Sequence, residues 1–268
     1  MLSLLKDYPF ILHGPLQAAL VVGAVCAFLG VHVVLRRVVF VGAALAQVSS
    51  AGVGLALLTG SNPSLLSLLL TLVGVAAFSV KSKDKRTTQE SFIGIGYAVA
   101  SAVAVLFVAK SAQGEGHMLD VLSGNILTVS ASEIWQMGII GLIAIGLHML
   151  FQKQFLYSAF DPETAQSSGV KAGRWDLFFF LILGIVIAMS IKLAGTLLVF
   201  AFLVLPAVTA LLFSQRLGKI HAIAVGSAVV ATVLGLYASV KFDMPSGPTI
   251  VAFSFAIFAV AWVISRFR

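Results

Sequence analysis

The sequence predicts an all-α protein that crosses a membrane about nine times, with eight crossings as the alternative. Of its 268 residues, 60% are hydrophobic and only 10% are charged, whereas a soluble domain carries about 25% charged residues. Several long stretches contain no Asp, Glu, Lys or Arg, and a membrane-spanning helix needs about 20 apolar residues. The basic residues also gather on one side when these stretches are threaded alternately through a membrane.

Eight uncharged stretches supply the predicted spans, at residues 8–35, 38–80, 91–109, 134–152, 177–191, 193–215, 220–240 and 244–265. The second stretch is long enough for two helices, and the turn cluster Thr59-Gly60-Ser61-Asn62-Pro63-Ser64 divides it. Pro63 suits the first position of the next helix. Unbroken runs of this length predict a helical bundle, because the strands of a membrane barrel alternate and are half as long. We expect a single membrane domain over residues 1–268.

Loop charge orients the predicted spans. Nine alternating spans place thirteen basic residues on one side, at Arg36, Arg37, Lys81, Lys83, Lys85, Arg86, Lys153, Lys171, Arg174, Arg216, Lys219, Arg266 and Arg268. Only Lys6, Lys110, Lys192 and Lys241 fall on the other side. Because basic loops stay in the cytoplasm, we expect an external N-terminus and a cytoplasmic C-terminus. The net charge of +7 then reflects a basic membrane surface and needs no nucleic-acid partner.

Breaks and small residues shape the later spans and their packing. Pro206 lies in the middle of residues 195–213, where it is expected to kink the helix and line a cavity. Residues 243–248 (Asp-Met-Pro-Ser-Gly-Pro) form a predicted external turn before the last span. Glycines are expected to let helices approach closely, at Gly42, Gly52, Gly54, Gly94 and Gly96.

Ionisable residues are scarce inside the spans, where they usually mark ion-coupled carriers. Every Asp and Glu lies at or beyond a span end, and His32 is the histidine nearest to the interior. We expect structural packing roles for His13, His32, His148 and His221, and a core position for Cys26. The chain has no Gly-x-x-x-x-Gly-Lys-Ser/Thr phosphate loop and no hydrolase motif, so we expect no ATPase site and no bound cofactor.

Two predicted connections are longer than a tight turn. The external one, residues 110–133, carries Glu115, His117 and Asp120, which either face water or touch a passing cation. The cytoplasmic one spans residues 153–175 and contains a predicted short helix near 161–168.

The signals for this short helix follow one another along the cytoplasmic connection. Asp161 is a good N-cap, Pro162 fits the first helical position, Glu163 favours the positive end of the dipole and Gly169 suits the stop. So short a helix needs a packing partner. It serves either as a docking element or as a simple interfacial turn.

Five ordered segments together resemble the membrane subunits of bacterial ABC importers of the zinc/manganese permease family. They are Gly30 to Gly54 with its Arg-Arg pair, Leu119 to Leu127 (LDVLSGNIL), Phe160 to Gly169, Lys192 to Ala210 with GTLLV and PAVTA, and Asp243 to Val251 (DMPSGPTIV). The similarity runs from about Gly14 to Trp262.

This resemblance implies a permease in the bacterial inner membrane. Two permeases, as two copies or as paralogues, would enclose a translocation path, two cytoplasmic ATPases would bind and hydrolyse ATP, and an external solute-binding protein would deliver a divalent metal such as zinc, manganese or iron. The resemblance assigns coupling to the ATPase to Asp161, Pro162, Glu163, Ala165 and Gly169. It assigns the path to Gln47, Ser50, Pro206 and Thr209.

The sequence departs from the family at the expected metal ligands. Where the family reads Gly-Asp-x-Leu-Ala-His, this chain reads Gly42-Ala43-Ala44-Leu45-Ala46-Gln47. Ala43 cannot bind a metal, and Gln47 offers only a neutral carbonyl oxygen. Another permease in a heterodimer could supply ligands, the substrate could be a metal complex or an uncharged organic solute, or transport could need no tight site. An ion-coupled secondary carrier and a structural membrane protein are the alternatives from other classes.

Overall fold

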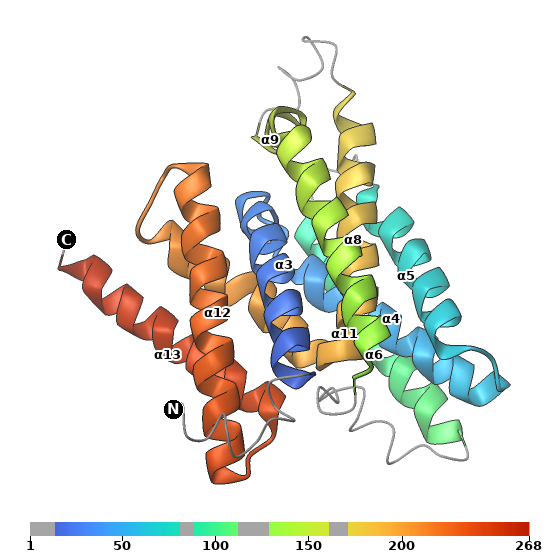
Figure 1. The fold of residues 1–268 in the computed structure, drawn as a ribbon. Helices are drawn as coiled ribbons and strands as arrows, with labels where there is room; N and C mark the ends of the chain where they lie inside the picture. The colour runs from blue at the N-terminus through green and yellow to red at the C-terminus, as the bar shows by residue number, and fades with distance from the viewer. Residues whose placement is uncertain (1–13, 81–87, 112–128, 161–170, 268) are drawn as a thin grey trace. The chain divides into compact units, whose positions relative to one another are not determined.

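The computed structural model describes residues 14–80, 88–111, 129–160 and 171–267. Within these ranges every regular element is a helix (Figure 1). In chain order they are α3 (Pro15–Leu35), α4 (Phe40–Thr59), α5 (Pro63–Ser79), α6 (Gln89–Lys110), α8 (Ala131–Leu150), α9 (Gln152–Phe160), α11 (Ala172–Leu211), α12 (Leu217–Phe242) and α13 (Ser246–Arg266).

These helices confirm the predicted all-α membrane fold. Seven of the described helices are long and apolar enough to cross a membrane, and α5 is a shorter apolar helix of 17 residues. At 40 residues, α11 covers two predicted spans, since about 60 Å of helix is twice the thickness of the hydrocarbon core. Each predicted span therefore has a helix, although the number of crossings is approximate because it depends on α5 and α11.

The non-helical break in α11 lies at Gly195, whereas the helix continues through Pro206, where a kink stays a prediction. Gly195 has φ 77° and ψ 165°, the non-helical backbone inside this helix, whereas Pro206 lies within the helix. Only glycine adopts this region of backbone space readily, because it has no Cβ. Proline removes one backbone hydrogen bond without requiring such angles, so the helix continues through it.

The chain divides into two compact units. One, unit 1, takes its described residues from 1–31, 120–142 and 190–268, and the other, unit 2, from 32–119 and 143–189.

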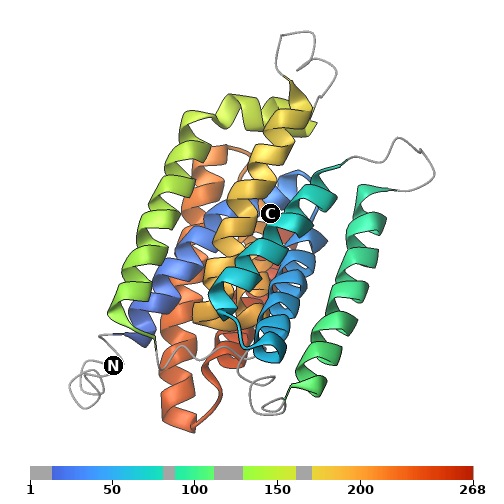
Figure 2. The same cartoon turned by 90° about the vertical axis from the view of Figure 1, so that its right-hand side faces the viewer.

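In unit 2, α4 lies beside α5 and α6 (Figure 2), and small residues occupy these contacts. A Cβ added to Gly52 would lie 2.5 Å from Ser67 Cα, and Ser49 Oγ is 2.7 Å from Ser67 Oγ. Gly54 faces α6, where its Cβ would meet Phe107 Cβ at 3.1 Å. The close approach predicted for Gly94 was wrong, because no neighbouring atom lies within 4 Å of its Cβ position.

In unit 1, α12 and α13 form an antiparallel pair. The turn that joins them lies within the predicted break at residues 243–248. Asp243 adopts the left-handed conformation (φ 52°, ψ 48°), and its N–H donates to Ser239 O. Ser239 Oγ donates to Met244 O at 2.6 Å. A Cβ on Gly235 would lie 2.5 Å from Ile250 Cα, so backbone contact again requires glycine.

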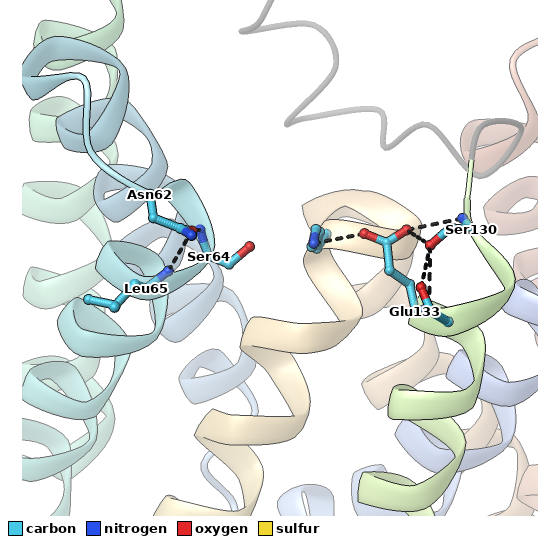
Figure 3. A network of polar contacts seen from close by, with 7 residues as sticks. Asn62, Ser64, Leu65, Ser130 and Glu133 are labelled. Carbon is cyan, nitrogen blue, oxygen red and sulfur yellow. Dashed lines mark hydrogen bonds and ion pairs between the residues drawn. The ribbon is translucent and has the colours of Figure 1, made fainter.

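The predicted turn between the second and third spans is confirmed in detail. Gly60 ends α4 in the left-handed conformation, with φ 67°. Asn62 Oδ1 accepts from the N–H groups of Ser64 at 3.0 Å and Leu65 at 3.4 Å (Figure 3). Pro63 occupies the first turn of α5, where its missing N–H costs nothing. Two helices therefore replace one long apolar stretch.

Many large apolar side chains lie on the surface of the helices. Examples are Val73 at 68% exposed, Leu106 at 67%, Trp135 at 74% and Leu142 at 73%. Water would penalise so much exposed apolar surface, whereas lipid would not. The exposed surface thus fits a membrane environment.

Candidate functional site

The second span presents the residues that replace the expected metal ligands. Ala43 and Gln47 lie one turn apart on α4, and both are partly exposed, whereas Ala44, Leu45 and Ala46 are buried. Gln47 thus reaches the surface of the chain with a neutral carboxamide. This face of α4 provides no carboxylate and no imidazole.

The other path candidates have hydroxyl groups that are already engaged. Ser50 Oγ, on α4 in unit 2, donates to Ala46 O at 3.0 Å. Thr209 Oγ1, on α11 in unit 1, donates to Leu205 O at 2.7 Å, and Pro206 is buried on the same helix. Each hydroxyl oxygen can therefore accept a hydrogen bond or coordinate a cation weakly. Gln47 and Ser50 belong to one unit, and Pro206 and Thr209 to the other.

The predicted coupling residues Asp161, Pro162, Glu163, Ala165 and Gly169 lie outside the described residues. So do Glu115, His117 and Asp120 of the external connection, and His13. The structure does describe both flanks of the coupling segment. Residues 152–160, expected to be part of a loop from 153, form helix α9, and Lys171 precedes the first residue of α11.

A buried ionic network joins these two flanks in unit 2. Arg36 Nη1 donates to Asp176 Oδ1 at 2.6 Å, and Nη2 donates to Phe155 O and to Ser158 Oγ, each at 2.9 Å. The guanidinium carbon also lies 4.2 Å from the centre of the Phe179 ring. We call Arg36, Phe155, Ser158, Asp176 and Phe179 the Arg36 cluster. It connects the turn after α3 with α9 and with the first turns of α11.

Burial makes the two charges of this network depend on each other. The side chains of Arg36 and Asp176 are only 7% and 3% exposed. Desolvation lowers the pKa of Arg36 from its usual value, and the nearby Asp176 carboxylate opposes that shift. Because two charges without water are stable only when paired and hydrogen-bonded, loss of one partner is costly. The cluster therefore holds its members in one arrangement.

Aromatic rings and two histidines cover the cluster. His148 stacks on Phe155 at 4.5 Å between ring centres, and His32 meets His148 edge-on at 4.9 Å. His148 Nδ1 donates to Ala144 O at 2.9 Å. Trp175 packs edge-on against Phe155 at 5.5 Å. The packing roles predicted for His32 and His148 fit these contacts.

The turn that carries Arg36 is fixed by backbone geometry. Arg37 has φ 56°, and the N–H groups of Arg37 and Val38 donate to Val34 O and Val33 O, a Schellman motif. Val39 provides no side-chain cap for the next helix, but Glu90 Oε1 accepts from Phe40 N at 3.2 Å. The first turn of α6 thereby caps α4 in this unit.

A second ion pair lies at the start of α8 in unit 1. Glu133 Oε1 is 2.7 Å from Lys192 Nζ, and its Oε2 accepts from Ser130 N at 3.1 Å and from Ser130 Oγ at 2.9 Å (Figure 3). Ser130 and Glu133 form a capping box. Lys192 is three residues before the break at Gly195. This pair is half-exposed, so it stabilises less than the Arg36 cluster.

Sequence reasoning singled out Arg36 only as a basic residue at a span end and did not single out Asp176. The available signal was one charge at the border of each of two apolar stretches, 140 positions apart. Nothing local pairs them. Among the described residues, no group of three His, Cys, Asp or Glu side chains could hold a metal ion. Cys26 is fully buried, as predicted, with its Sγ 3.7 Å from Ser190 Oγ.

Comparisons with known proteins cover nearly the whole chain. Residues 7–265 match the ABC 3 transport family. The chain is 30% identical over 254 residues to the manganese transport system membrane protein MntC of Halalkalibacterium halodurans, covering 95% of this chain and 87% of that protein. It is 28% identical to the manganese import system permease protein ScaB of Streptococcus gordonii, covering 97% and 93% of the two chains.

A solved structure shares the fold. It is described as PsaBC from Streptococcus pneumoniae in complex with Fab, and the alignment has a TM-score of 0.84 at 23% identity, covering 98% of this chain and 95% of that one. The family match and the curated relatives confirm the resemblance seen in the sequence. The chain is a multi-pass membrane permease that belongs to the ABC 3 transport family.

Proposed function

We propose that the chain is the permease of an ATP-driven importer that carries manganese or a related divalent cation, zinc or iron, across the bacterial inner membrane. The observation that carries this proposal is the full-length similarity to two manganese permeases, at 30% and 28% identity. Two permeases, identical or paralogous, would form the path at their interface. The partly exposed positions of Ala43 and Gln47 on α4 suit such an interface, because an isolated chain leaves that face open.

Three contacts fit the predicted nine-span topology. Arg36 pairs with Asp176, Glu90 caps Phe40, and Glu133 pairs with Lys192. In each case nine alternating spans place both partners at the same side of the membrane. The first two contacts fall on the basic side, which is cytoplasmic by the positive-inside rule. The third falls on the external side, where a solute-binding protein would deliver the substrate.

The ATPase would dock on residues 161–169 from the cytoplasm. This chain would contribute the path and the coupling segment, and ATP would bind and react on the partner subunit. Closure of the ATPase dimer would push on the coupling segment and so open one end of the path while closing the other.

A second candidate substrate follows from α4. With alanine at position 43 and glutamine at position 47, this chain gives a bare cation no strong ligand on that helix. A metal complex or a small uncharged solute needs no such ligand. The same importer architecture would then carry a different cargo.

The substrate is tested by co-expressing the chain with its ATPase and solute-binding protein. ATP hydrolysis is measured in lipid with manganese, zinc, iron and no metal. We expect specific stimulation by manganese delivered on the binding protein. ATP hydrolysis that is coupled to the binding protein but indifferent to every metal would assign the metal-complex or organic-solute alternative. A chain that recruits no ATPase would contradict the importer assignment itself.

The coupling assignment has its own test. Replacing Glu163 with Lys and Ala165 with Trp is expected to abolish stimulated ATP hydrolysis while the chain still folds. Transport that persists in this double variant would refute the coupling role of the segment.

A further inference from the structure

We propose that Arg36 is a positioning residue that makes the two flanks of the coupling segment and the start of α4 move as one body. This proposal rests on the proposed function, because it assigns a mechanical role within that importer. It concerns only described residues on either side of 161–170, and all of them belong to unit 2.

The side chain of Arg36 reaches both flanks of the coupling segment. Arg36 binds Phe155 O and Ser158 Oγ of α9, which precedes the coupling segment, and Asp176 of α11, which follows it. The two helices also contact each other through the rings of Phe155 and Trp175, and ten residues of chain join them between Phe160 and Lys171. A guanidinium that bonds to both flanks fixes their separation directly.

The hydrogen bonds of the Arg36 guanidinium hold it in one orientation. Arginine presents a planar fork of donors, so separate bonds to a carboxylate, a carbonyl and a hydroxyl fix its orientation. Ser158 Oγ also donates to Phe155 O at 3.1 Å, which closes the network within α9. The ring of Phe179 covers the guanidinium. A lysine would place one compact charge there and could not form the same fork.

The chain connects the Arg36 cluster to the proposed path. Arg36 lies in the Schellman turn that ends α3, and only Arg37, Val38 and Val39 separate it from α4. Helix α4 begins at Phe40, whose N–H is capped by Glu90, and carries Ala43 and Gln47. Displacement of the coupling flanks therefore pulls on the start of α4 through Arg36. The family's substrate positions are one and two turns further along that helix.

The chain offers a matched control at the next residue. Arg37 carries the same charge but is exposed, and its φ of 56° suits glycine. Arg37→Gly removes one positive charge from the same turn without touching the Arg36 cluster. Any effect of bulk charge or membrane-surface potential would appear in both variants, whereas loss of the network would appear in Arg36→Met alone.

The functional test uses the full permease with its ATPase and binding protein in proteoliposomes, and measures manganese taken up per ATP hydrolysed. We expect Arg36→Met to co-purify with the ATPase and to hydrolyse ATP, but to lose at least tenfold in this ratio. The ratio for Arg36→Lys should lie between those of Arg36→Met and the wild type, and the ratio for Arg37→Gly should stay within twofold of the wild type. An unchanged ratio in Arg36→Met, or an equal loss in Arg37→Gly, would overturn the proposal.

A folding defect is separated by a second variant. Arg36→Met combined with Asp176→Leu removes both charges of this pair from the buried site and should recover thermal stability. Its transport ratio should remain low, because two apolar side chains cannot bind Phe155 O and Ser158 Oγ. Recovery of transport together with stability would show that the cluster only stabilises the fold, and would overturn the positioning role.

A third measurement does not depend on the substrate. Spin labels at Phe40→Cys and Tyr157→Cys, both exposed positions, report the distance between α4 and α9 in a Cys26→Ser background. We expect that distance to stay constant between nucleotide-free and ATP-bound complexes, and to change or broaden in Arg36→Met. A wild-type distance that changes with ATP would refute the single-body claim. Absence of manganese uptake with a constant wild-type distance would refute only the proposed substrate.

Discussion

Arg36 and Asp176 are 140 residues apart in the sequence, yet their side chains meet at 2.6 Å in a site almost closed to solvent. One lies in the turn after α3 and the other in the first turns of α11. The pair holds together the helices on both sides of the segment to which we assign ATPase docking.

Removing one charge of this pair should destabilise the protein strongly. Asp176→Asn leaves the Arg36 guanidinium buried without its counter-charge, which costs about 3–5 kcal/mol. The measurement is unfolding of the purified chain in detergent. Arg37→Gly is the control, because it also removes one charge. We expect Arg37→Gly to be neutral or slightly stabilising, since φ 56° is unfavourable for arginine. Equal stability of Asp176→Asn and wild type would show that the pair is not buried as described.

Gly195 should tolerate no side chain. A Cβ at φ 77° and ψ 165° strains the backbone, so Gly195→Ala is expected to lose about 1–3 kcal/mol of stability or to straighten α11 and impair transport. Gly226→Ala is the control, because Gly226 is exposed inside α12 with no atom within 4 Å of its Cβ position. That change should stabilise by about 0.5–1 kcal/mol. The reverse order of the two variants would argue against a break at Gly195.

The contact between α4 and α5 gives a third prediction. Gly52→Ala places a Cβ 2.5 Å from Ser67 Cα, and this backbone contact cannot be relieved by rotating a side chain. We expect a loss of about 1–3 kcal/mol from the forced separation of the helices. Gly94→Ala, on α6 with open space around it, should cause no loss. The measurement is thermal unfolding of both variants in the same detergent. Equal stability of the two variants would contradict the close contact at Gly52.

The path assignment predicts a gain of function. Ala43→Asp with Gln47→His places a carboxylate and an imidazole one turn apart on the partly exposed face of α4. If that face lines the path, equilibrium dialysis should show divalent-metal affinity at least tenfold above wild type. The control is the same spacing on α12, Ala222→Asp with Gly226→His, at two exposed positions. A similar gain in both double variants, or in neither, would remove α4 from the path.

Local chemistry made much of the fold predictable from sequence. The length of each uncharged stretch gave a helix, because membrane crossing requires a long apolar segment. Gly60, Asn62 and Pro63 specified the turn between α4 and α5, since each residue type satisfies a helix end in its own way. The same holds for the turn at Asp243.

Features that depend on distant neighbours were not predictable. Gly195 and Pro206 lie in one apolar stretch, and the non-helical backbone is at Gly195, which the sequence alone did not single out. The close approach at Gly52 and the open space at Gly94 look alike in sequence, because each depends on which helix lies opposite. The pairing of Arg36 with Asp176 likewise follows from the arrangement of α3, α9 and α11. The ligand chemistry of the path stays a prediction, as do the roles of residues 161–169.

ATP-driven uptake of radioactive manganese tests the central claim most directly. The chain, its ATPase and its solute-binding protein are reconstituted in proteoliposomes, and uptake is followed with ATP and with a nonhydrolysable analogue. We predict accumulation that requires ATP and the binding protein and is competed by unlabelled manganese. Coupled ATP hydrolysis without any manganese accumulation would contradict the proposed substrate.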